Sequence, residues 1–149
     1  GWEYIENVHK NGARMGKGSG QVIDDTASGD LLACIGVDYI VNDKIKKGAD
    51  LALVYPPEML VIPSPIAILK NSPNAEAAKK FVDFVLSKEG QTIIAEDGTL
   101  PVRNDVKAPD RYKLPTPEEA MKRAMKIDYK AIMAEKEATI KKFTDIMQK

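Results

Sequence analysis

Two polar side chains that directly follow an apolar segment are the best candidates for binding chemistry in this chain. Residues 30–35 (DLLACI) are mostly apolar, and Gly36, Asp38 and Tyr39 come next. The segment predicts a buried parallel strand, and ligands of open α/β sheets bind at the carboxyl ends of such strands. A carboxylate and a phenol at that edge suit a ligand site. The structural alternatives are that Asp38 caps the next helix and that Tyr39 is a packing residue.

A glycine-rich segment at residues 16–20 (GKGSG) is the second candidate. Ser19 is placed to cap a short helix that ends at Gly29, and free backbone N–H groups at a helix N-terminus can hold an anion. The segment lacks the GxxxxGK[ST] pattern, and its glycines do not fit GxGxxG. A flexible connection is therefore the favoured interpretation of Gly16 to Gly20. An anion contact through Ser19 and Gly20 is the alternative.

Residues for catalysis are not assembled in this sequence. His9 is the only histidine and Cys34 the only cysteine, and GxSxG, HExxH and CxxC patterns are absent. We expect His9 to lie at the surface and Cys34 to be a buried, unreactive thiol in an apolar segment. Asp24 and Asp25 are neighbours on a predicted helix, so their side chains point in different directions. The sequence predicts a protein that is not an enzyme and that carries no cofactor.

Composition and charge exclude two further classes. The 149 residues contain 22 basic and 22 acidic side chains, so the net charge is zero and a nucleic-acid partner is not expected. No apolar stretch is long enough to span a membrane. The chain begins at Gly1 without a methionine or a leader sequence, which we interpret as a mature chain or a fragment. A length of 149 residues suits a single domain with a sizeable core.

The elements that would position these residues are predicted by periodicity, caps and turn residues, and together they indicate an α/β fold. Prolines 63 and 65 make central sheet pairing unlikely around them, and three or four strands are few for this much helix. The sheet therefore looks incomplete. The predicted strands are 30–35, 49–55 and 66–69. The predicted helices are 2–11, 19–28, 38–47, one that begins at Ser72–Pro73, 88–96, one that begins at a capping box at Thr116, and one capped by Asp128.

One succession of motifs resembles a known family. It comprises GWEYIENVHKNG, GSGQVIDDTASGDLLACIGVDY, GADLALVYP and, at residues 74–102, NAEAAKKFVDFVLSKEGQ with a GTLPVR turn. The chain resembles the carboxyl-terminal half of type 2 solute-binding proteins of ABC transporters, in the branch of ferric-ion, phosphonate and sugar-phosphate receptors. The resemblance implies a two-lobed α/β fold whose amino-terminal lobe strands are missing here. It places 1–58 in the carboxyl lobe, 59–115 in the crossing strand and amino lobe, and 116–149 in terminal helices packed on the carboxyl lobe.

The resemblance also implies a function. The protein would be the periplasmic or extracellular, cell-surface-associated binding component of an ABC importer, capturing a small anionic solute or a ferric ion and delivering it to the membrane permease. Ferric-ion members carry two adjacent tyrosines where this chain has Asp38 and Tyr39, which would be the ligands if iron were the cargo. Gly36, Ser19 and Gly20 complete the candidate site. The alternative is a self-contained α/β nucleotide- or phosphate-binding enzyme domain that uses Gly16 to Gly20. A homodimer formed by exchange of chain segments is a further expectation.

Overall fold

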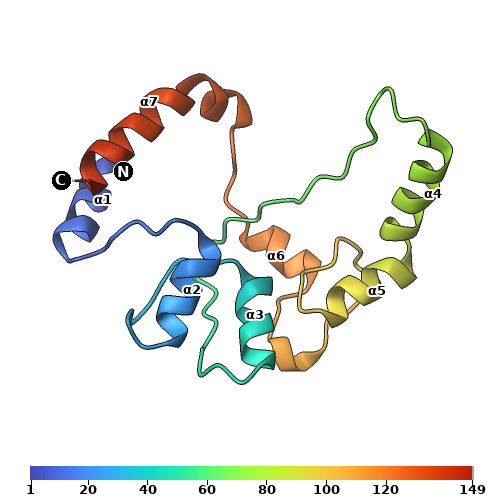
Figure 1. The fold of residues 1–149 in the computed structure, drawn as a ribbon, viewed down its shortest axis with the longest axis horizontal. Helices are drawn as coiled ribbons and strands as arrows, with labels where there is room; N and C mark the ends of the chain where they lie inside the picture. The colour runs from blue at the N-terminus through green and yellow to red at the C-terminus, as the bar shows by residue number, and fades with distance from the viewer. Residues whose placement is uncertain (149) are drawn as a thin grey trace.

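The computed structural model describes residues 1–148 as helices joined by long extended connections (Figure 1). Between these residues no β-strand is formed, and an isolated parallel bridge joins Met59 to Ala124. The helices in chain order are α1 (Trp2–Lys10), α2 (Ser19–Ala27), α3 (Asp38–Lys46), α4 (Ala75–Leu86), α5 (Lys88–Glu96), the 3₁₀ helix η1 (Asp110–Tyr112), α6 (Pro117–Arg123) and α7 (Tyr129–Met147).

The prediction of an α/β fold is wrong for the described residues. The segments 30–35, 49–55 and 66–69 form no regular secondary structure, the first with bends at residues 30 and 32, and none has a neighbouring strand to accept and donate its backbone hydrogen bonds. Their apolar side chains are consequently exposed: Leu32 and Ile35 are 103% and 99% accessible, and Val54 is 84% accessible. The apolar composition predicted burial between layers, but burial of a strand requires paired strands and a covering layer as well.

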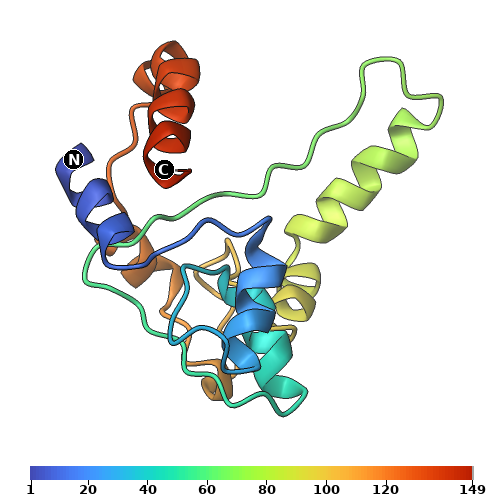
Figure 2. The same cartoon turned by 60° about the vertical axis from the view of Figure 1, so that its left-hand side comes forward.

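The molecule is open. Its accessible surface is 11,759 Å², whereas a compact protein of 16.4 kDa exposes about 7,500 Å². In Figures 1 and 2, α4 and the α1–α7 pair lie at opposite ends, and the chain that follows Met59 crosses the space toward α4 without pairing with another segment, up to the turn at residues 70–71. The excess surface follows from these unpaired segments, because each exposes both edges and both faces.

The buried centre lies where α2, α3 and α5 meet. Ile23 of α2 is fully buried, and Val41 of α3 lies beside it. A Cβ atom on Gly36 would lie 2.9 Å from Cγ1 of Ile23, so a residue with no side chain is required where the two helices approach. Asn42 is 1% exposed and donates a 2.9 Å hydrogen bond from Nδ2 to the carbonyl of Gly98, which joins α3 to the end of α5.

Several helix boundaries follow local signals. Ser87 accepts a hydrogen bond from the N–H of Gly90 and caps α5, whose predicted range is confirmed. Thr116 and Glu119 form the predicted capping box of α6, and the Asp128 carboxylate accepts hydrogen bonds from the first turn of α7.

Three predictions about local structure are wrong. The cap of α4 is Asn74, two residues after Ser72, and the cap of α2 is Gly18, which leaves Ser19 inside the helix. Cys34 is half-buried, because its extended segment has no covering layer.

The two terminal helices contact each other. α7 packs against α1, and the Lys142 ammonium lies 4.7 Å from the centre of the Trp2 ring, at a distance that allows a cation–π interaction. Ile146 is the buried residue of α7. This contact brings the two ends of the chain together, as Figure 1 shows.

Candidate functional site

Asp38 and Tyr39 form the first turn of α3. Val37 is the N-cap residue, and Oδ1 of Asp38 accepts a 2.8 Å hydrogen bond from the backbone N–H of Tyr39. Partial burial raises the pKa of the Asp38 carboxyl above its ordinary value of 3.8, more strongly than the backbone hydrogen bonds lower it. None of the ion pairs among residues 1–148 involves Asp38. The site therefore contains a half-buried carboxylate whose charge no basic side chain neutralises.

Tyr55 lies close enough to Asp38 for that carboxylate to affect the pKa of its phenol, and the sequence analysis did not single it out. Its hydroxyl is buried and has no hydrogen-bond partner among the described residues. Burial, followed by the negative charge of Asp38, raises the pKa of the Tyr55 phenol, so the group stays a neutral O–H donor. An unpartnered buried hydroxyl is costly. Tyr55 stands at the end of the apolar segment 49–55, and Asp38 stands shortly after the end of the apolar segment 30–35. This shared position was the signal in the sequence that could have indicated Tyr55.

Arg123, at the end of α6, holds the turn that carries Tyr55. Its guanidinium donates hydrogen bonds to three successive backbone carbonyls: from Nη2 to Tyr55 at 3.1 Å and to Pro56, and from Nε to Pro57 at 3.2 Å. The N–H of Met59 then donates to the Arg123 carbonyl at 2.8 Å. Arg123 lies more than 60 residues from this turn along the chain, so no local pattern in the sequence indicated the contact.

Ser19 and Gly20 lie in the first turn of α2, where the backbone N–H groups are free. The N-cap Gly18 has no side chain to accept from them, and the first turn contains no acidic residue. The preceding loop folds closely over the helix, since a Cβ atom on Gly16 would lie 2.2 Å from Cγ1 of Val22. Such a helix N-terminus is compatible with an anion, because its unpaired N–H groups and the helix dipole both favour negative charge.

The arrangement of α2 and α3 brings the first turn of α2 and the first turn of α3 to the same end of the helix pair. Both helices run in the same direction in Figures 1 and 2, so their N-termini lie at the same end. The Lys44 ammonium of α3 is paired with the Asp24 carboxylate of α2, and Gly36 allows the close approach to Ile23. The structure thus places Gly36 in the packing between α2 and α3, against Ile23 and Val41. Its role as a ligand contact stays a prediction.

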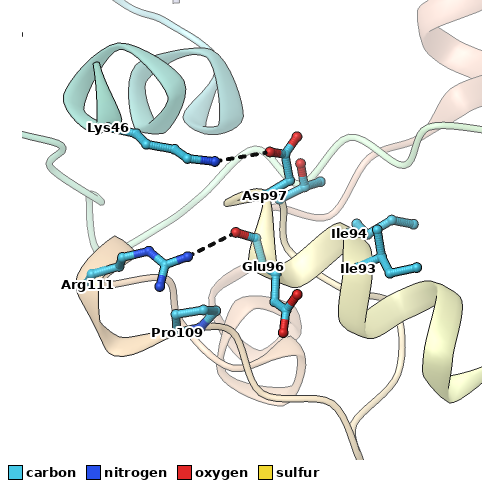
Figure 3. A pocket seen from close by; sticks show the side chains of 8 residues that line it. Lys46, Ile93, Ile94, Glu96, Asp97, Pro109 and Arg111 are labelled. Atoms are coloured by element: carbon cyan, nitrogen blue, oxygen red, sulfur yellow. Dashed lines mark hydrogen bonds and ion pairs between the residues drawn. The ribbon is translucent and has the colours of Figure 1, made fainter. Parts of the chain in front are cut away.

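A cleft of about 600 Å³ lies between α3, the end of α5 and η1 (Figure 3). Nζ of Lys46 lies 3.8 Å from Oδ1 of Asp97, and Nη2 of Arg111 donates a 3.2 Å hydrogen bond to the carbonyl of Glu96. Both cationic groups are therefore engaged by neighbouring oxygen atoms. None of the residues that the sequence predicted for the site lines this cleft.

Two findings bear on metal ions and membranes. Among residues 1–148, no three or more His, Cys, Asp or Glu side chains gather as a metal cluster. In the same part of the chain, none of the helices combines the length and the apolar character that crossing a membrane requires.

Comparison with known proteins identifies the family. Residues 1–100 match the family described as bacterial extracellular solute-binding protein, and the chain belongs to this family. The resemblance stated from the sequence motifs is confirmed at this level. Family membership also supports a binding protein over the enzyme-domain alternative, because the family is defined by solute binding.

Curated relatives are similar over part of their length. The phosphoglycerate transport regulatory protein PgtC of Salmonella typhimurium is 32% identical over 99 residues, which cover 66% of this chain and 25% of PgtC. A putative 2-aminoethylphosphonate-binding periplasmic protein of Salmonella typhimurium is 26% identical over 119 residues, which cover 75% of this chain and 35% of that protein. The chain thus spans about a quarter to a third of these relatives. No solved structure matches.

Proposed function

We propose that this chain supplies one wall of the solute site of a binding protein that serves an ABC importer, and that the solute is a small organic phosphonate or phosphate. The observation that carries the proposal is the combination, at one end of the α2–α3 pair, of free backbone N–H groups and an unneutralised carboxylate. The printed names of two relatives, one for phosphoglycerate transport and one for 2-aminoethylphosphonate binding, support a phosphorus-containing solute.

The anionic group of the solute is assigned to the first turn of α2. Ser19 and Gly20 offer N–H donors, and no carboxylate in that turn opposes a phosphonate. The first turn of α3 is the poorer anion site, because Asp38 already places a negative charge there.

A positively charged amine on the solute is assigned to Asp38. The carboxylate accepts one backbone hydrogen bond, retains further lone pairs, and lacks a basic partner among the described residues. Tyr39, which is 47% exposed, stands next to it and offers a phenol face or hydroxyl. The site therefore suits a zwitterion such as 2-aminoethylphosphonate better than a simple anion.

Ferric ion is the weaker candidate for the cargo. Iron favours several hard, negatively charged oxygen ligands, and Asp38 with Tyr39 provides two oxygen-bearing side chains. The raised pKa of Tyr55 disfavours the phenolate that would make a third ligand. The titration described below also tests binding of iron.

The remaining expectations are part of the same proposal. The protein acts in the periplasm or outside the cell, two lobes close around the solute by hinge motion, and the loaded form engages a membrane permease. Residues 1–58 and 116–149 belong to one lobe, an assignment that the contact between α1 and α7 supports. The segment that begins at residue 59 crosses to the other lobe, whereas α5 stays with the first lobe, because Asn42 of α3 donates a buried hydrogen bond to the carbonyl of Gly98 at the end of α5. Binding by these 149 residues is expected to be weak, because the described site has a wall on one side only.

A residue-resolved titration tests this function. Nitrogen-15-labelled protein is titrated with 2-aminoethylphosphonate, and saturable shifts are expected at the amides of Ser19, Gly20 and Tyr39. Ethylphosphonate lacks the amine and ethanolamine lacks the phosphonate, so each should bind more weakly. Saturable shifts confined to the Lys46–Arg111 cleft, or none at these three amides, would contradict the proposal. Selective broadening around Tyr39 by ferric citrate, without a phosphonate response, would replace the phosphonate by iron.

A further inference from the structure

The turn at residues 55–57 (YPP) cannot be held in place by ordinary strand pairing. Pro56 and Pro57 have no backbone N–H, so two of the three residues can only accept hydrogen bonds. Successive carbonyls of an extended chain point to opposite sides, and one neighbouring strand can therefore bond to every second carbonyl only. A side chain with several donors is the kind of group that can bind three carbonyls in succession.

Arg123 supplies these donors from α6. Its Nη2 atom donates to the carbonyl of Tyr55 at 3.1 Å and also to that of Pro56, and its Nε atom donates to that of Pro57 at 3.2 Å. A guanidinium carries five N–H donors in a rigid planar fork, whereas a lysine ammonium is a compact point charge. The interaction thus uses the shape of the arginine side chain as well as its charge.

The other contacts of Arg123 serve the same connection. None of the ion pairs of the described residues includes it, and the carboxylate of Glu119, one turn earlier, is bonded to the capping residue of α6. The N–H of Met59 donates to the Arg123 carbonyl at 2.8 Å, and the N–H of Met125 donates to the Met59 carbonyl at 2.9 Å. Both the side chain and the main chain of Arg123 therefore fasten residues 55–59 to the end of α6.

This turn carries the Tyr55 phenol, which lies within electrostatic reach of the Asp38 carboxylate. The negative charge of Asp38 contributes to raising the pKa of the phenol. The Tyr55 hydroxyl is buried and makes no hydrogen bond within the described residues, so the two side chains are not bonded to each other. Their proximity is therefore set by the backbones that carry them, which are the first turn of α3 and the turn at residues 55–57.

We propose that Arg123 is a positioning residue: by binding three carbonyls of the turn at residues 55–57, it holds the Tyr55 side chain beside Asp38. It makes α6 part of the frame of the candidate site, although Arg123 lies more than 60 residues from that turn along the chain. The importance of this position for a solute rests on the proposed function. The contact itself does not, because it is tested without solute, and a failure to bind phosphonates would leave it standing.

Tyrosine labelled with carbon-13 at Cζ reports whether Tyr55 stays beside Asp38. The Tyr55 signal, assigned through Tyr55→Phe, should follow the ionisation of Asp38 with a midpoint above the ordinary pKa of 3.8, and Asp38→Asn should abolish this response. In Arg123→Gln the response should lose at least about half of its amplitude, because electrostatic interaction falls with distance. Tyr39, next to Asp38 in the first turn of α3, is the internal control and should keep its response.

Two further variants separate the shape of the arginine side chain from its charge. Arg123→Lys keeps the positive charge without the planar fork, so it should lose the Tyr55 response as Arg123→Gln does. Arg103→Gln is the matched control, because Arg103 also donates to a backbone carbonyl, that of Leu86 at 3.3 Å, and this variant should keep the response. A full Tyr55 response in Arg123→Gln, or its rescue by Arg123→Lys, would overturn the proposal. An equal loss at Tyr39 would also overturn it, since Arg123 would then maintain the fold in general.

Discussion

Replacing Asp38 by asparagine is expected to weaken binding of 2-aminoethylphosphonate by about tenfold to a hundredfold and to leave binding of ethylphosphonate nearly unchanged. The reason is that the carboxylate is the assigned partner of the amine, and its negative charge is not neutralised by any basic side chain within residues 1–148. Asparagine preserves the size of the side chain but removes the charge. Chemical-shift titration with both solutes measures the selectivity directly.

The matched control is Asp43→Asn, a change of the same kind on the same helix. Asp43 lies in the second half of α3, and its carboxylate is 2.6 Å from the Lys47 ammonium, so its replacement should leave both affinities unchanged. A loss of affinity for both phosphonates in Asp38→Asn would show that Asp38 orders the helix terminus. Equal effects of Asp38→Asn and Asp43→Asn would contradict the assignment of the solute amine to Asp38.

The pH dependence follows from the raised pKa of Asp38. Affinity for the amine should fall on acidification at a higher pH than an ordinary aspartate would give, because the carboxylate is protonated earlier. The effect of acidification on stability has the opposite direction to its effect on affinity for the amine. The folded state binds this proton more readily than the unfolded state, so the Asp38 contribution to stability improves as the pH falls through the raised pKa. Asp38→Asn should therefore not lower the melting temperature at pH 7, which a thermal scan without solute can check.

Replacing Gly98 by alanine is expected to lower the free energy of unfolding by about 2–4 kcal/mol. Gly98 has a φ of +87°, which alanine adopts with strain, and a Cβ atom there would lie 2.9 Å from Cβ of Asn42 and 3.2 Å from Cε1 of Tyr112. Asn42 and Tyr112 are both buried, so neither can move easily. Urea unfolding followed by circular dichroism measures the loss.

Gly48→Ala separates the cost of the positive φ from the cost of crowding by neighbouring side chains. Gly48 also has a positive φ, +95°, but no heavy atom would lie within 4 Å of an added Cβ. It should lose only the backbone contribution of about 1–2 kcal/mol. The difference between the two variants then reports the crowding against Asn42 and Tyr112. Equal losses would mean that the junction of α3, α5 and η1 has room to rearrange and does not hold the described centre rigidly.

Local signals in the sequence predicted much of the helical structure. Thr116 with Glu119, and Asp128, each cap the helix they were predicted to cap, because a cap depends on atoms within three residues. Ser87 caps α5 without having been predicted as a cap. The strands were not obtained, because an extended segment becomes a strand only with a partner. Leu32 and Ile35 have the composition of a buried strand and are exposed in its absence.

The candidate site was predictable in part for a related reason. Asp38 and Tyr39 were predicted as site residues because they follow an apolar segment directly in the chain, and their role stays a prediction. Tyr55 ends the next apolar segment and was passed over as its last residue. Arg123 could not be found from the sequence, since its three carbonyl partners lie 66 to 68 positions away. Contacts of that separation are set by the folded arrangement and leave no periodic trace in the sequence.

Native mass spectrometry of the protein purified from its own host tests the central claim most directly. The protein is kept at neutral pH and low ionic strength, so that a weakly held solute is retained, and the mass of the bound species is read from the difference between the loaded and the denatured protein. The account predicts a small organic phosphonate or phosphate, lost in the Asp38→Asn variant if the solute carries an amine. A ferric adduct that disappears in Tyr39→Phe, or a bound nucleotide that depends on Ser19, would contradict it.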